Sequence, residues 1–351
     1  MAEPAFESFA FEGQQDAAKF GLRQRATFPL ALKPVEGWQP TLQESIALLR
    51  QLSESGALFE QVRNHGGAVL IRGLPIATPQ DYSEIAHAFG FPAHEEVGRP
   101  PLRTVLARNV KTANEGWVAL VQYARDINHD KTARAAYMAP QRVWVVYDQP
   151  CLADILLSRR PELCLGLAAA LNEQAPEFVQ ALLEKGVKYV YRYGLEEVAS
   201  NTGTSVLGAY GQHVQPGDDQ ETRREKIEDE VRRHSDHFEW HEDGSLSVTH
   251  IVPIIRRHEE TGLTTWFGNL TSAWGRSKFH GATEPPYRGD DDSYHPPPLY
   301  GDGSKIENQY LDLALSLAES LQVPVKWQKG DIVLLDVRLI TQFSHAALTL
   351  D

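Results

Sequence analysis

The sequence has very few cysteines and no long apolar run. Cys151 and Cys164 are the only cysteines among 351 residues, too few for a disulfide framework or a CxxC zinc knuckle, which fits a reducing compartment. No apolar run reaches the roughly 18 residues that a membrane-spanning helix needs. The first residues show neither the basic nor the apolar region of a secretory signal. We therefore expect a cytoplasmic protein with no membrane partner.

The sequence also has fewer basic than acidic residues. The chain carries 34 Lys and Arg against 47 Asp and Glu, a formal net charge of -13. An acidic surface repels phosphate backbones, so we expect no nucleic-acid partner. With 42% hydrophobic and 23% charged residues, the composition is typical of a soluble globular protein. The expected partner is a small-molecule substrate, and a homo-oligomer or a pairing with a homologue stays open.

The first half of the chain predicts helices and short buried strands. Residues 1–40 contain several prolines and are expected to form an irregular N-terminal arm. Thr41, with Glu44 three residues later, is typical of a capping box that begins a helix. Ala68 to Ile71 and residues 141–148 ("QRVWVVYD") are expected to be buried strands.

The second half predicts hairpins and a long loop. Asp243-Gly244 and Thr261-Gly262 are hairpin turn signals. Residues from about 270 to 303 are rich in Gly, Pro and Asp and are expected to be a long irregular insertion. Strands interspersed with helices indicate an α+β fold with a mostly β core wrapped by helices. We expect residues 41–351 to form a single domain.

Five segments carry a resemblance to a known family. They are "RNHGGAVLIRGLPIATPQDYSEIAHAFG", "NVKTANEG", "APEFVQALLEKGVKYVYR", "LTTWFGNL" and "VKWQKGDIVLLD", spread over roughly residues 62–340. In this order they resemble the taurine dioxygenase-like (TauD/TfdA-like) family, particularly its fungal members. The resemblance implies a double-stranded β-helix, or jelly roll, with its active site at the mouth. It also implies iron(II), held by a His-x-Asp/Glu pair and a distant His, with 2-oxoglutarate chelating the metal.

The family's metal and co-substrate positions are altered in this chain. Aligned without gaps, the first ligand His falls on Asp130, the Glu on Thr132 and the last His on Gln342. The family's Gly-Gly-x-Thr element has no counterpart after Tyr147, and no Arg follows Arg338 on the final strand. Loss of these ligands should lower the affinity for ferrous iron by orders of magnitude. The motifs therefore predict a dioxygenase scaffold whose metal centre is lost.

These positions define the candidate site. The predicted catalytic residues are Asp130, Thr132, Tyr147, Arg338, Gln342 and His345, and the predicted substrate contacts are Asn114, Trp266 and Asn269. For Trp266 ordinary core packing is the alternative, and for Asn114 it is holding a turn. If a metal binds, its ligands would be His129, Asp130 and His345. The His-rich stretch "HSDHFEWHEDG" is interpreted as a solvated face, and His250 and His258 as exposed strand and turn residues.

Three functions are compatible with these residues. The first is a metal-independent, non-oxidative cyclase or isomerase, pericyclases included, that acts on a small natural-product intermediate of secondary metabolism and needs no cofactor. The second is an Fe(II)/2-oxoglutarate-dependent dioxygenase, a hydroxylase or desaturase with displaced ligands. The third is a catalytically inactive pseudo-dioxygenase subunit. The altered ligand positions favour the first.

Overall fold

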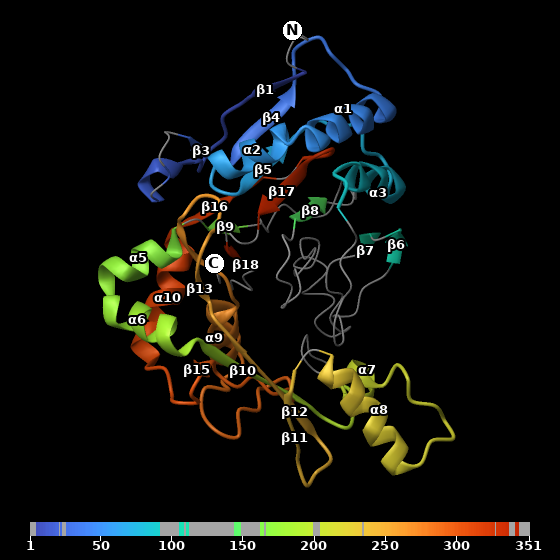
Figure 1. Cartoon of the computed structure of the whole chain (residues 1–351), viewed down its shortest axis with the longest axis vertical. Coiled ribbons are helices and arrows are strands. Elements are labelled where there is room, and N and C mark those ends of the chain that lie inside the picture. The colour runs from blue at the N-terminus through green and yellow to red at the C-terminus, as the bar shows by residue number, and fades with distance from the viewer. Residues whose placement is uncertain are drawn as a thin grey trace.

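The fold combines helices and strands (Figure 1). The computed structural model describes residues 5–20, 22, 26–91, 105–108, 110–111, 144–148, 162–164, 166–198, 204–233, 235–326, 328–336 and 341–343. Every structural statement below is confined to these residues. Within them, no helix is both long and apolar enough to cross a membrane.

A five-stranded sheet organises the upper half of the molecule in Figure 1. Its order is β1 (Phe6–Ser8), β4 (Leu30–Pro34), β5 (Ala68–Ile71), β17 (Ile332–Asp336) and β8 (Trp144–Asp148). The β4–β5 pair is parallel and the other pairs are antiparallel. Strands β5 and β17 are buried along their whole length, which confirms the buried strand predicted at Ala68 to Ile71.

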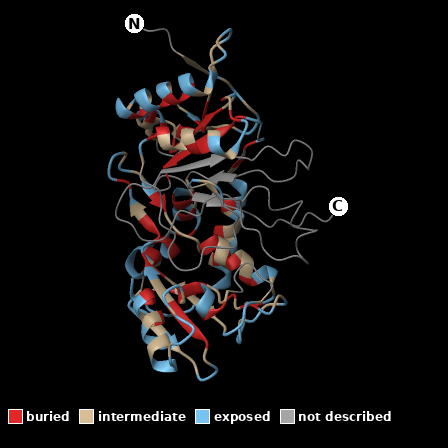
Figure 2. Cartoon of the chain, turned by 90° about the vertical axis from the view of Figure 1, so that its right-hand side faces the viewer, coloured by how far each residue is buried: buried red, intermediate tan, exposed pale blue. Residues whose placement is uncertain are grey.

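Alternate residues of the two central strands face two different apolar clusters. Val69 and Leu334 pack with three helices, α1 (Leu42–Glu54), α2 (Ala57–Asn64) and α3 (Pro79–Ala88). Leu70 and Val333 pack on the other face with the N-terminal segment. Figure 2 shows that these helices turn their buried sides toward the sheet. The period-2 alternation of a strand thus lets one short apolar run serve two cores.

Local sequence signals explain how the helices begin. Thr41 and Glu44 form the predicted capping box at the start of α1. Thr78 and Asp81 form a second one at the start of α3, where Pro79 takes the first helical position. Each box gives hydrogen-bond partners to backbone N–H groups that a helix start leaves unpaired.

The expectation of an irregular arm over residues 1–40 is wrong in part. Strands β1 and β4 belong to the main sheet, and β2 (Gln15–Asp16) pairs with β3 (Thr27–Phe28), with a 3-10 helix, η1 (Ala17–Phe20), between them. The prolines flank β4 rather than interrupt it, because Pro29 precedes the strand and Pro34 ends it. Proline is tolerated at strand ends, where no ladder hydrogen bond is lost. The single domain over residues 41–351 stays a prediction.

A four-stranded antiparallel sheet lies in the lower half of Figure 1. Its order is β11 (His237–Trp240), β12 (Leu246–Val252), β10 (Val187–Tyr193) and β15 (Leu299–Tyr300). The predicted hairpin at Asp243-Gly244 is confirmed, since it joins β11 to β12. Two helices pack near this sheet, α7 (Val206–Tyr210) and α8 (Gln220–Arg232).

Four helices and a hairpin surround the largest apolar cluster. The helices are α5 (Leu167–Gln174), α6 (Pro176–Lys185), α9 (Leu270–Phe279) and α10 (Asn308–Ser320). The hairpin of β13 (Ile255–Arg257) and β14 (Thr264–Trp266) confirms the turn predicted at Thr261-Gly262. Smaller pieces complete the fold: the sheet of β16 (Gln322–Pro324), β9 (Glu162–Cys164) and β18 (Thr341–Phe343), and the pair of β6 (Val105–Ala107) and β7 (Val110–Lys111).

The insertion expected at about 270–303 is more regular than predicted. Its first ten residues form α9, and its end includes β15. The apolar residues Leu270 and Trp274, one turn apart, are buried, and they anchor α9 in the core. The α+β class is therefore confirmed as a mixture of helices and sheets, while closure of the strands into a jelly roll stays a prediction.

Candidate functional site

Two of the predicted catalytic residues lie on described strands. Tyr147 in β8 is opposite Val333 of β17, in the five-stranded sheet. Gln342 in β18 is opposite Leu163 of β9, in the three-stranded sheet. Tyr147 and Gln342 therefore lie in different sheets and are not opposite each other in a strand pair.

Most of the other predicted site residues lie outside the described part of the chain. These are Asn114, His129, Asp130, Thr132, Arg338 and His345. Their proposed roles in catalysis, substrate binding or metal ligation stay predictions.

The predicted substrate contacts Trp266 and Asn269 lie close together in the chain. Trp266 ends β14, and Asn269 directly precedes α9. Trp266 is 2% exposed and belongs to the apolar cluster that includes Ile254 and Leu270, which is the packing role given as its alternative. Asn269 precedes α9, and its backbone N–H donates to the Tyr189 hydroxyl at 3.2 Å. Contact of either residue with a substrate stays a prediction.

The expectation that His258 is an exposed turn residue is wrong. Its relative exposure is 7%, and its Nε2 lies 3.4 Å from Oδ2 of Asp336, itself 7% exposed. His258 lies in the turn between β13 and β14, which is next to the end of β17. Contacts with Thr261 of the same turn hold the ring in place. His250, expected to be exposed, is half-buried against the ring of Tyr191.

The turn after β13 fixes which nitrogen of His258 carries the proton. The Thr261 backbone N–H donates to Nδ1 at 3.2 Å, and the Thr261 hydroxyl lies 2.9 Å from the same nitrogen. Nδ1 is therefore the acceptor, and in the neutral ring Nε2–H points toward the Asp336 carboxylate. Local sequence patterns do not predict this pair, since its members are 78 positions apart and meet only through tertiary packing.

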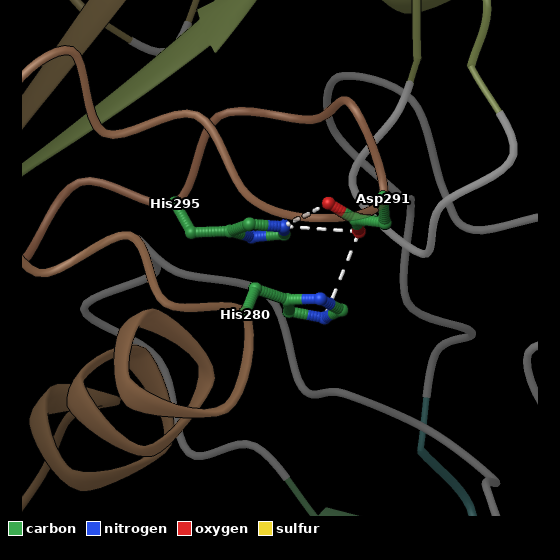
Figure 3. A group of neighbouring side chains, drawn as sticks. All are labelled: His280, Asp291 and His295. Atoms are coloured by element: carbon green, nitrogen blue, oxygen red, sulfur yellow. Dashed lines mark hydrogen bonds and ion pairs between the residues drawn. The ribbon is translucent and has the colours of Figure 1, made fainter.

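A second group of titratable side chains lies in the loop after α9 (Figure 3). One ligand atom each of His280, Asp291 and His295 lies within 4.8 Å of the others. His295 donates from Nε2 to both Asp291 oxygens, at 2.8 and 3.0 Å. The two imidazole rings stack, with centroids 4.3 Å apart and planes 9° from parallel.

The loop holds this group through close backbone packing. A Cβ on Gly289 would lie 2.7 Å from His280 Cβ and 2.8 Å from Oδ1 of Asp291, so glycine is required there. The Ser277 hydroxyl donates to the His295 carbonyl at 2.7 Å, which ties the loop to α9. The sequence predicts an irregular insertion here and does not single out its histidines. The H-x10-D-x3-H spacing is the only signal it carries.

Burial favours the neutral form of His295. Desolvation lowers the pKa of this imidazole, and the hydrogen bond to Asp291 opposes the shift without reversing it. His295 is therefore favoured in its neutral form, which can offer a lone pair.

The described residues of the His-rich stretch 234–244 form no such group. Asp236 and His237 are exposed, and Nε2 of His241 lies 2.7 Å from the Ser247 hydroxyl. Within the described part of the chain, the group of His280, Asp291 and His295 is the one whose geometry fits a metal. The prediction of a solvated face is confirmed for Asp236 and His237, whereas His241 is half-buried.

Comparison with known proteins supports the family indicated by the sequence motifs. A clavaminate synthase-like protein of Arabidopsis thaliana is 25% identical over 316 residues, covering 88% of this chain and 87% of the relative. No family model matches the chain. The match over most of both chains supports the resemblance to the TauD-like family that the motifs indicate.

One solved structure is also similar over most of the chain. It is described as an alpha-ketoglutarate dependent 2,4-D dioxygenase from Burkholderia xenovorans, is 11% identical, and aligns with a TM-score of 0.34 over 89% of this chain and 85% of that chain. A score this low carries no argument about the fold or the site.

The resemblance predicts ligand positions whose residues do not fit iron(II). It places Asp130, Thr132 and Gln342 where the family has the two imidazoles and the carboxylate of its facial triad. This set offers one carboxylate, a neutral hydroxyl and an amide, and it lacks the imidazole donors that ferrous sites use. We derive no step through iron at these positions.

Proposed function

We propose that this chain is a metal-independent, non-oxidative enzyme, a cyclase or isomerase of a small natural-product intermediate. The donor set at the family's ligand positions supports loss of the oxidative reaction. The observation that carries the proposal is the buried pair of His258 and Asp336 at the end of β17. Asp336 directly precedes the stretch that contains Arg338 and Gln342, so the pair lies in the chain next to the positions from which the family takes its last ligand.

The pair suits proton transfer. In this proposal the Asp336 carboxylate takes a proton from an activated carbon of the substrate and returns it at another position. The Nε2–H of His258 donates to the Asp336 carboxylate before the first transfer and again after the second, when the side chain is charged. Arg338 and Gln342 would polarise a substrate carbonyl, and Tyr147 would donate a hydrogen bond. Because no electron leaves the substrate, the reaction balances without oxygen or a co-substrate.

For a cyclisation, the site would also contribute by orienting the substrate. A site that holds the reacting ends of a flexible substrate close together removes much of the entropic barrier, and orientation alone can supply several kcal/mol. An enzyme of this kind needs polar groups of modest strength rather than a metal, and Asp336 with its histidine partner is such a group.

The second candidate is an Fe(II)/2-oxoglutarate-dependent dioxygenase with displaced ligands. It is favoured by the clavaminate synthase-like relative, which matches over most of both chains. It requires nitrogen and carboxylate ligands at positions other than Asp130, Thr132 and Gln342.

One spectroscopic experiment separates the two candidates. Ferrous iron and 2-oxoglutarate added without oxygen to the metal-stripped protein should give no visible charge-transfer band, because the altered positions cannot present iron to the keto acid. On admission of air, no succinate should form above the level of a protein-free control. A band together with stoichiometric succinate would establish the dioxygenase and reject the first candidate.

Substitution of His258 tests the proton-transfer pair. The substrate would be the small molecule that native mass spectrometry detects with the purified protein. His258→Gln should lower kcat by about 10²–10⁴-fold, as loss of acid–base assistance does, and should leave KM nearly unchanged. His237→Gln, at an exposed position of β11, is the matched control and should keep full activity. A His258→Gln enzyme with unchanged kcat would exclude the pair from the reaction.

A further inference from the structure

The loop from His280 to His295 brings together ligands typical of a transition metal. Two imidazoles and one carboxylate come from three separated points of the loop, and their ligand atoms lie within 4.8 Å of one another. The side chains are largely shielded from solvent, with exposures of 16% for His280, 8% for Asp291 and 1% for His295. None of the three is at a position where the family resemblance places a ligand.

A second carboxylate orients the most exposed of the three side chains. Nδ1 of His280 lies 2.7 Å from Oδ1 of Asp290, so the ring donates its N–H to that carboxylate. In the neutral ring the lone pair is then on Nε2, which lies 3.6 Å from Oδ2 of Asp291. Ligand histidines of metal sites characteristically donate their other N–H to a carboxylate in this way.

This arrangement places two electron-rich atoms opposite each other. The Nε2 lone pair of neutral His280 and an Asp291 oxygen repel one another unless a cation lies between them. Figure 3 shows both imidazoles on the same side of the carboxylate, with Nε2 of each directed toward Asp291. A bound ion would replace the repulsion with two ligand bonds. It would also bind Nε2 of His295 once the proton that this nitrogen now donates to Asp291 has moved to Nδ1 or been released.

Binding requires only a local rearrangement. An imidazole ligates in the plane of its ring, and the two rings are stacked in parallel, so one of them must tilt to share an ion. His280 has the room, because it lies at the C-terminal end of α9 with the larger exposed fraction.

We propose that His280, Asp291 and His295 form a site for a divalent transition-metal ion of the zinc class, which fastens the loop after α9 to the end of that helix. Two imidazoles favour zinc and cobalt ions over calcium and magnesium, which prefer all-oxygen sites. Three protein ligands leave the remaining coordination for water. The site is independent of the reaction proposed above, which uses other residues.

The test is metal binding to the full-length protein after dialysis against a chelator. Isothermal titration with Zn²⁺ should show one more bound equivalent in the wild type than in Asp291→Asn or His280→Gln. With Co²⁺ in place of Zn²⁺, the wild type should develop visible ligand-field bands that both variants lack. Asp290→Asn should keep the site but weaken it by about 10–100-fold, because it removes only the carboxylate that orients His280.

The loop offers a matched control. Asp292 neighbours Asp291 but its side chain is 75% exposed and pairs with Arg288 at the surface, so Asp292→Asn should bind zinc as the wild type does. Far-ultraviolet circular dichroism verifies that each variant folds, and His280→Gln decides the matter if Asp291→Asn does not fold. Equal zinc stoichiometry in the wild type and His280→Gln would overturn the proposal, as would a wild type that binds no zinc at neutral pH.

Discussion

Arg72→Met is expected to lower the free energy of unfolding by about 3–5 kcal/mol at neutral pH, the cost of leaving a buried charge without its partner. Two nitrogens of Arg72 donate to the two oxygens of Asp331, at 2.9 and 2.8 Å, and one of them also donates to the Lys326 carbonyl. The Asp331 side chain is 0% exposed. Methionine preserves much of the apolar packing of the arginine stem but offers no donor to this carboxylate.

The loss should depend on pH in a defined direction. Burial raises the pKa of Asp331, and the hydrogen bond from Arg72 acts against that shift. Without Arg72 the pKa rises further, so the folded variant binds a proton more tightly than the unfolded chain does. Stability of the variant should therefore increase as the pH falls through the raised pKa toward the unfolded value of about 3.9.

Urea denaturation of both proteins between neutral and mildly acidic pH measures this effect. Lys33→Met is the matched control, because Lys33 pairs with Glu7 at 3.1 Å on the same sheet but both side chains are more than 40% exposed, at 47% and 42%. An exposed pair contributes about 0–1 kcal/mol, so the control should lose little at any pH. Equal losses for the two variants, or a pH-independent loss for Arg72→Met, would show that Asp331 is not held as described.

The role of Asp331 bears on how the family motif should be interpreted. The segment "VKWQKGDIVLLD" carries the resemblance to dioxygenases, yet its first acidic residue neutralises Arg72 and accepts from the Gln328 backbone N–H at 2.9 Å. It stabilises the start of β17 rather than taking part in chemistry. The last residue of the same segment, Asp336, pairs with His258 instead. One motif therefore contains a structural carboxylate at one end of a strand and a candidate catalytic one at the other.

Much of the fold could be predicted from local signals. The capping box at Thr41, the hairpin turns, and the apolar runs that form β5 and β17 all act within a few residues, and each is observed. The strand β4 was missed because its place in the sheet depends on parallel pairing with β5. No local pattern encodes a partner that lies about 40 positions away.

The candidate site was harder to predict for the same reason. The sequence predicts a turn residue at His258 because Thr261-Gly262 is a local turn signal, whereas the partner Asp336 is distant in the chain. His280 and His295 lie in a loop whose Gly, Pro and Asp content predicts irregular backbone, and only close packing at Gly289 brings their rings into a stack. The family's ligand positions were identified by alignment alone, and most of them lie outside the described residues.

Gly330→Ala should be among the most destabilising single substitutions in the described part of the chain. Gly330 has a φ of +80°, and a Cβ there would lie 2.1 Å from the Leu74 carbonyl oxygen. The Leu74 N–H also donates to the Gly330 carbonyl at 3.0 Å, so the two backbones cannot separate without losing that bond. We expect a loss of about 3 kcal/mol or more in the free energy of unfolding, from backbone strain and the forced shift together.

A second glycine separates these two contributions. Gly56 has a similar φ of +76° but nothing within 4 Å of its added Cβ, so Gly56→Ala should cost only the left-handed conformation, about 1–2 kcal/mol. The difference between the two variants in urea denaturation then measures the clash with Leu74. If the losses were equal, the turn before β17 could open without resistance. In that case the close approach of Gly330 to Leu74 would not fix the start of β17, the strand that follows Asp331 and ends at Asp336.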